Sequence, residues 1–267
     1  MATYTHVPVL HTVRKNSPFL YAVVMIHLVG ALAATAGIFI DERELMGINV
    51  WIKPLKFCLS GAIYILTVGY LINFYPYSNR KKHVLRNIVS ITLLIEIGII
   101  VYQGARGVKS HYNQDSAFDG ILFALMGLLI GINVLLMVLF AFDTLRKKMN
   151  TPQAVQWGIF LGWLLVLFGS WVGGRMIGQM AHNVGVADGG EGLPILNWST
   201  IAGDLRVAHF FGLHAIQIIP LFALGLVKAK SPKSMQLIGV VVFALLYGGF
   251  IGYTFWQAKQ ALPFLTL

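Results

Sequence analysis

The residues with the clearest potential for chemistry lie in one apolar stretch, Gly203 to Pro220. This stretch is hydrophobic enough for half a transmembrane helix, yet it carries polar side chains that are costly in hydrocarbon without a partner. On a helix, several of them fall within an arc of roughly 140°: Arg206, His209, His214 and Gln217. The pattern predicts a helix whose polar face looks into the protein.

His209 and His214 are five residues apart. A spacing of four would place both imidazoles on one helix face for a single metal ion, whereas five residues turn the helix by about 140° beyond a full turn. The two rings therefore diverge, so they serve neighbouring ligands, or one binds a ligand while the other forms a hydrogen bond. We expect them to act as ligands or proton carriers. The alternative is that both are hydrogen-bonded packing residues.

His27 lies in the middle of another apolar run, so two predicted spans each offer a histidine near the membrane midplane, His27 and His214. A bis-histidine b-type haem needs two neutral imidazoles from facing helices. Arg106 and Arg206, at predicted helix ends, would hold the propionates or another anionic group. The alternatives are a hydrogen bond between helices for His27, and pairing with acids or with the membrane interface for the arginines.

His111 and His182, together with His209, are candidate ligands of a transition metal ion. Three histidines and a water molecule form the usual catalytic zinc site, and copper or iron accepts the same ligands. Asp119 would then act as a general base or orient a ligand. The alternative is that the loop histidines are exposed polar residues, because the ligands are spread over three segments.

Glu96 is the one acid deep inside an apolar run. A carboxyl there is either protonated or paired with a cation, and His27, His214 and Arg175 are candidate partners. Its functional interpretation is a proton-handling acid, with Gln103 on nearly the same helix face. The alternative is a neutral glutamic acid that is bonded to a backbone carbonyl.

The elements that position these residues follow from composition. The chain has 267 residues, of which 57% are hydrophobic and 11% charged, whereas soluble domains carry about 25% charged residues. The apolar residues form blocks close to the roughly 20 residues that cross a bilayer, without the alternation of a β-barrel. We predict an all-α membrane protein, a seven-transmembrane helix bundle.

The predicted bundle is a single domain at residues 17–260, between a cytoplasmic tail at 1–16 and a C-terminal tail at 261–267. The spans are expected at about 18–40, 55–75, 87–105, 118–142, 152–177, 204–227 and 235–258. Three of them begin with a hydroxyl N-cap before a proline at the first helical position. These pairs are Ser17-Pro18, Thr151-Pro152 and Ser231-Pro232.

The net charge of +10 reflects membrane topology rather than nucleic-acid binding. One side of the predicted bundle holds most of the basic residues and a single acid, Asp143, which places the N-terminus in the cytoplasm and the C-terminus in the periplasm. The single cysteine, Cys58, excludes an internal disulfide. The basic residues of that side are Arg14, Lys15, Arg80, Lys81, Lys82, Arg86, Arg146, Lys147, Lys148, Lys228, Lys230 and Lys233.

Three sequence segments resemble those of a group of uncharacterised bacterial polytopic inner-membrane proteins. They are Lys53-Pro-Leu-Lys-Phe57, Arg106-Gly-Val-Lys-Ser-His-Tyr-Asn113 and the stretch from Gly203 to His214. The resemblance implies a bacterial inner (cytoplasmic) membrane location and brings no activity with it.

These observations favour a membrane-embedded redox protein with haem b or a transition metal ion (zinc, copper or iron) in the periplasmic half. A quinone or a periplasmic electron carrier would be its partner beside the lipid bilayer. Two alternatives stay open. One is a metal-dependent hydrolase of lipid-like substrates, although the HxxxH motif of seven-span hydrolases is absent from the last span. The other is a transporter of protons or small solutes.

Overall fold

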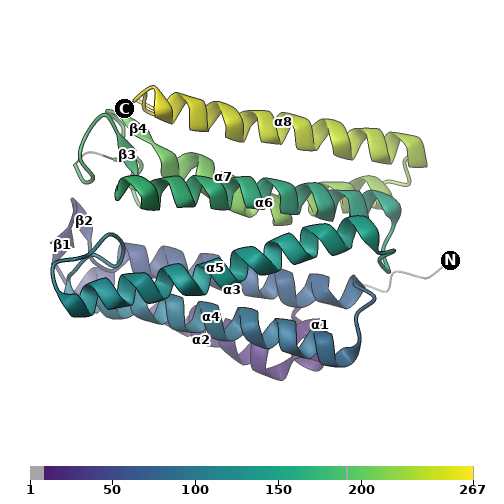
Figure 1. Cartoon of the computed structure of the whole chain (residues 1–267), viewed down its shortest axis with the longest axis horizontal. Coiled ribbons are helices and arrows are strands. Elements are labelled where there is room, and N and C mark those ends of the chain that lie inside the picture. The colour runs from purple at the N-terminus through teal and green to yellow at the C-terminus, as the bar shows by residue number, and fades with distance from the viewer. Residues whose placement is uncertain (1–8, 191, 267) are drawn as a thin grey trace. The chain divides into compact units, whose positions relative to one another are not determined.

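The computed structural model describes residues 9–190 and 192–266, and these residues are mostly helical (Figure 1). Part of the predicted cytoplasmic tail, residues 1–8, lies outside the described residues, as does residue 267 of the predicted C-terminal tail. The chain divides into two compact units. Unit 1 comprises residues 1–45 and 49–133, and unit 2 comprises residues 46–48 and 134–267. Each unit is described by itself.

Helices lie where the seven spans were predicted: within the described residues, seven helices are long and apolar enough to cross a membrane. The largest difference is in the third span, which begins at Asn79 rather than near residue 87, because Ser78 caps its polar first turn by accepting a hydrogen bond from Lys81 N. The helices are α2 (Pro18–Ile40), α3 (Ile52–Leu71), α4 (Asn79–Arg106), α5 (Ala117–Arg146), α6 (Gln153–Gln179), α7 (Leu205–Lys228) and α8 (Lys233–Lys259).

Several short elements between the spans were not expected from the sequence. Helix α1 (Val9–Asn16) falls in the predicted tail, and the fully buried Val13 packs it onto unit 1. A 3-10 turn, η1 (Ile72–Phe74), follows α3. Four strands of two residues each add to the helices: β1 (Glu44–Leu45), β2 (Ile48–Asn49), β3 (Asn183–Val184) and β4 (Gly203–Asp204), of which β3 and β4 pair antiparallel.

Large apolar side chains cover the outside of the long helices. A soluble protein rarely exposes wide apolar patches, so these side chains indicate contact with lipid and support a multi-pass membrane protein. Five leucines on α2, α5 and α8 expose between 63% and 72% of their surface: Leu32, Leu128, Leu135, Leu245 and Leu246.

The predicted helix N-termini, each a hydroxyl N-cap followed by a proline, are only partly right. Ser17 is the N-cap of α2 with Pro18 at the first helical position, but its side chain makes no capping hydrogen bond. At the other two starts, Pro152 and Pro232 are themselves the N-cap residues, so α6 and α8 begin one residue later than predicted. The ψ angles of these prolines, 145° and 142°, are extended and cannot begin a helical turn.

Close helix packing within each unit depends on glycine. In unit 1, a Cβ on Gly69 of α3 would lie 2.7 Å from the Leu20 side chain of α2. In unit 2, a Cβ on Gly212 of α7 would lie 2.6 Å from the Cα of Gly169 on α6. Larger residues would force the helices apart, as is usual at small-residue contacts between membrane helices.

Arg86 joins three segments of unit 1. Its side chain is buried, and the guanidinium donates hydrogen bonds to Asn73 Oδ1 (2.7 Å), Asn16 O (3.3 Å) and Gly69 O (3.4 Å). Asn16 ends α1 and Gly69 lies in the last turn of α3. The cation is therefore placed at the negative ends of two helix dipoles.

We expect Arg86→Ala to lower the free energy of unfolding by roughly 1.5–3 kcal/mol, because charged donors are lost from buried acceptors. The matched control is Arg80→Ala in the first turn of the same helix, where the side chain is exposed. Thermal unfolding in detergent should show a lower midpoint for the Arg86 variant and an unchanged one for the control. Equal midpoints would contradict the structural role of Arg86.

Candidate functional site

The polar face of α7 brings His209 against α6 in unit 2. His209 Nδ1 lies 2.8 Å from Gly169 O. A carbonyl oxygen only accepts hydrogen bonds, so Nδ1 carries the proton and Nε2 keeps its lone pair. Gly173 of α6 makes room for the ring, because a Cβ there would lie 2.9 Å from His209 Cε1.

His214 has different neighbours. Its ring lies against Phe210, with centroids 4.5 Å apart, and Gln217 is its polar neighbour one turn further along α7. His209 meets α6, whereas His214 meets residues of its own helix. These separate surroundings agree with the expectation that the two rings diverge.

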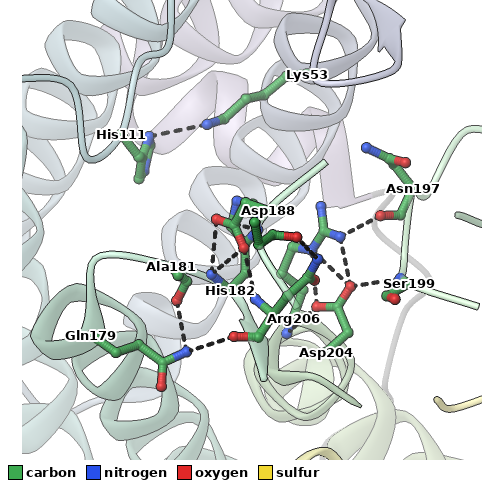
Figure 2. A network of polar contacts seen from close by, with 12 residues as sticks. Lys53, His111, Gln179, Ala181, His182, Asp188, Asn197, Ser199, Asp204 and Arg206 are labelled. Atoms are coloured by element: carbon green, nitrogen blue, oxygen red, sulfur yellow. Dashed lines mark hydrogen bonds and ion pairs between the residues drawn. The ribbon is translucent and has the colours of Figure 1, made fainter. Parts of the chain in front are cut away.

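The start of α7 is organised by a buried ion pair (Figure 2). Asp204 is 1% exposed, and its carboxylate accepts hydrogen bonds from Ser199 N (2.9 Å), Arg206 N (2.9 Å) and the Arg206 guanidinium (2.6 Å). Arg206 also donates to Asn197 O. Arg206 therefore holds the loop before α7, and the predicted binding of an anionic group would require this pair to open.

A second carboxylate, Asp188, orders the loop after α6 (Figure 2). It accepts hydrogen bonds from His182 N (3.0 Å) and Asn183 N (2.8 Å), and the His182 Nδ1 atom lies 2.9 Å away. Burial raises the pKa of Asp188, but the His182 imidazole and the two backbone N–H groups lower it by more, so the pKa lies below its ordinary value of 3.8. Asp188 was not identified from the sequence.

In unit 1, His111 lies among potential hydrogen-bond partners and aromatic rings. Its Nδ1 is 3.3 Å from Lys53 Nζ and 3.1 Å from Ser110 Oγ (Figure 2). The imidazole also lies 5.7 Å from the ring of Phe57, centroid to centroid. An amine and a hydroxyl therefore lie within hydrogen-bonding distance of the same ring nitrogen. Ser110 was not identified from the sequence.

Asp119 and Arg106 bind each other in unit 1. Arg106 Nη1 donates to Asp119 Oδ1 (2.6 Å), Gln103 Nε2 donates to the same oxygen (2.8 Å), and Ser116 Oγ donates to Oδ2 (2.6 Å). These contacts join the end of α4 to the start of α5. A general-base role for Asp119, or an anion-binding role for Arg106, would require this group of bonds to open.

Two polar residues lie deep in unit 1 with an atom that lacks a partner in the described part of the chain. His27 is 3% exposed, and its Nδ1 lies 2.7 Å from Val23 O while its Nε2 has no hydrogen-bond partner. Glu96 is 8% exposed, and its Oε2 also has none. The two side chains are therefore not hydrogen-bonded to each other through these atoms.

The structure does not test whether the predicted ligands converge. His27 and His111 belong to unit 1, whereas His182, His209 and His214 belong to unit 2. The haem pair His27–His214 and the triad His111, His182 and His209 therefore stay predictions. Within residues 9–190 and 192–266, no group of three or more histidine, cysteine or acidic side chains lies together as a metal site.

Comparison with protein-family models, with curated proteins and with solved structures finds no match to this chain.

The carboxylate of Asp188 makes the loop of unit 2 sensitive to acid. Because its pKa in the folded state is below the ordinary value, Asp188 stabilises the loop above pH 3.8, and this contribution is lost as the pH falls below that value. Cleavage by pepsin within residues 180–204 should therefore rise in this acid range. Asp188→Asn should be cleaved readily even at the highest pH at which pepsin is active. The control Asp115→Asn, at an exposed position, should be cleaved as the wild-type protein is.

The position of His209 depends on Gly173. Gly173→Ala would press a methyl group against the imidazole and should lower the free energy of unfolding by about 1–3 kcal/mol. Gly174→Ala is the matched control, because a Cβ there meets nothing within 4 Å. Thermal unfolding in detergent compares the two. Equal midpoints would show that His209 does not pack against α6 as described.

Proposed function

We propose that this chain is a multi-pass protein of the bacterial inner membrane that binds haem b, or a transition metal ion, through histidine and takes part in electron transfer. The observation that carries the proposal is the buried His27 imidazole in α2. Its Nδ1–H donates to the backbone carbonyl of Val23, and its Nε2 has no hydrogen-bond partner in the described residues.

This arrangement suits a ligand for three physical reasons. A histidine that binds a metal usually donates its other N–H to a carbonyl or carboxylate, which fixes the tautomer and the ring orientation. The remaining nitrogen must be neutral and carry a free lone pair. A buried polar atom without a partner is also costly, by about 1–3 kcal/mol, so a bound metal would remove the penalty.

Haem needs fewer protein ligands here than an isolated metal ion does. The porphyrin supplies four of the iron ligands, so the protein needs to add only one or two histidines. The helix face around His27 is apolar, with Val23, Val24 and Ala31 buried on the same side. Gly61 of α3 and the side chain of Ile97 lie against this nitrogen, because a Cβ on Gly61 would lie 3.4 Å from His27 Nε2 and closer still to Ile97 Cδ1. Bound haem would therefore have to displace the Ile97 side chain.

His209 supports the proposal as a second candidate ligand. It has the same tautomer, with Nδ1 bonded to Gly169 O, and it belongs to the polar face of α7 that carries His214. Bound haem would supply one-electron chemistry at its iron, and a quinone or a periplasmic carrier would exchange the electron. The chain would contribute the axial nitrogen, the apolar surroundings and the exclusion of water.

We infer the orientation from charge. In each unit one set of helix ends carries the basic residues, Arg14 and Arg86 in unit 1 and Arg146 and Lys228 in unit 2, so these ends would face the cytoplasm by the positive-inside rule. The N-terminus then lies in the cytoplasm and the C-terminus in the periplasm. The polar start of α7, with Asp204 and Arg206, would face the periplasm.

The visible spectrum of the purified protein tests the proposed function. Protein produced with a supply of haem should show a Soret band, and His27→Ala should lose most of that absorbance. His83→Ala is the control, because His83 is exposed on α4 and should keep it. A colourless protein that takes up neither haem nor metal on reconstitution would contradict the proposal. Bound zinc without colour would favour the metal-dependent lipid hydrolase instead.

A further inference from the structure

A second buried group in unit 1 involves Glu96 and does not depend on haem. Glu96 lies in the middle of α4, between two polar contacts that join α4 to α5. Thr92, Glu96, Ile99 and Gln103 are spaced by four, three and four residues, so they form one stripe along the helix. The contacts of Thr92, Ile99 and Gln103 show which neighbouring helix this stripe faces.

The stripe faces α5. Thr92 Oγ1 accepts a hydrogen bond from Asn133 Nδ2 (2.8 Å) on α5, one turn from Glu96. Ile99 packs with Met126 of α5, less than one turn from Glu96 on the other side. At the end of the stripe, Gln103 contacts Asp119, also on α5. Glu96 therefore lies at the α4–α5 contact, between Asn133 and Met126.

Helix α3 brings Tyr64 to the same place. Phe57 of α3 packs on the cluster of Ile99, Ile100 and Met126. Tyr64 follows Phe57 by seven residues, two helical turns, so it lies on the same face of α3 about 10 Å further along the helix. On α5, Asn133 lies seven residues beyond Met126 in the same direction. Helical spacing therefore places Tyr64, Glu96 and Asn133 at one level of the contact between α3, α4 and α5.

Each of these residues has an oxygen without a hydrogen-bond partner among the residues that the structure describes. These atoms are Tyr64 Oη, Glu96 Oε2 and Asn133 Oδ1, and all are buried. Buried polar atoms without partners are rare and costly, most of all in hydrocarbon. Three at one junction indicate a bound group that supplies the missing partners.

The chemistry of the donors identifies this group. They are a carboxylate, an amide oxygen and a hydroxyl, which are the oxygen ligands that hard cations prefer. The junction holds one formal negative charge, so a singly charged cation makes it neutral, whereas a divalent ion would leave a buried net charge. We propose that Tyr64, Glu96 and Asn133 bind one monovalent cation, H⁺ or Na⁺, inside the membrane.

Other titratable and charged groups lie near Glu96. Arg86 and Arg106 of α4 lie ten residues away on either side, about 15 Å along the helix, and bind other segments. Asp119 of α5 is bound to Arg106. The imidazole of His27 lies against Gly61 of α3, and the Cys58 thiol of α3 packs with Ile97 on the adjoining face of α4. The groups that face the junction from its three helices are Glu96, Tyr64 and Asn133.

Labelling with a hydrophobic carbodiimide tests the site in the unchanged protein in lipid vesicles, because the reagent modifies protonated carboxyls in the membrane. Mass spectrometry should find Glu96 labelled at low pH and progressively less labelled as the pH rises. If Na⁺ is the cation, sodium chloride should suppress labelling strongly at constant pH while choline chloride does not. If H⁺ is the cation, both salts should act alike. Absence of labelling at every pH, or labelling independent of pH and of salt, would overturn the proposal.

Tyr64→Phe shows whether the three residues act together. Loss of one ligand or hydrogen bond should change about fivefold the cation concentration at which the labelling of Glu96 is half-maximal. Tyr102→Phe, whose side chain is half exposed on α4, should leave it unchanged. An unchanged value in the Tyr64 variant would show that Glu96 acts alone and would contradict the three-residue site. His27→Ala should be labelled as the unchanged protein is, so this test is independent of haem binding.

Discussion

A polar atom buried in the protein has no water to bond with, and this constraint explains the contacts of the best-connected polar side chains. Arg86 satisfies it by binding the ends of α1 and α3, and Asp119 satisfies it with Arg106, Gln103 and Ser116. Asp204 satisfies it with Arg206 and the Ser199 backbone. In each case a polar group that is costly in isolation joins separate segments of the chain.

The same constraint makes the buried polar atoms without a partner in the described residues candidates for ligand binding. His27 Nε2 and Glu96 Oε2 lie deep in unit 1, where rotation toward water offers no relief. The imidazole offers a lone pair and therefore suits a metal or haem iron, whereas the carboxyl, beside Tyr64 and Asn133, suits a cation.

The number and order of the membrane helices could be predicted because length and hydropathy decide them locally. His27 and Glu96 could be identified too, because a histidine or an acid is conspicuous in an apolar run. Tyr64 could not, since a tyrosine in an apolar run is indistinguishable from a packing residue. The unpartnered oxygens of Tyr64 and Asn133 emerge only from the packing of the helices. The proline starts were displaced at Pro152 and Pro232 by a ψ angle that sequence does not reveal. The role of Asp188 depends on its contacts with His182 and Asn183, which the sequence does not reveal.

The tautomer of His27 is the most direct test of the account, because the proposed ligand atom must be free of a proton. Solid-state nuclear magnetic resonance of protein with ¹⁵N-labelled histidine in bilayers distinguishes protonated from unprotonated ring nitrogens, and comparison with His27→Ala assigns the signals. We predict a protonated Nδ1, an unprotonated Nε2, and a change of the Nε2 signal when haem is added. A protonated Nε2, or a signal that haem leaves unchanged, would contradict the account.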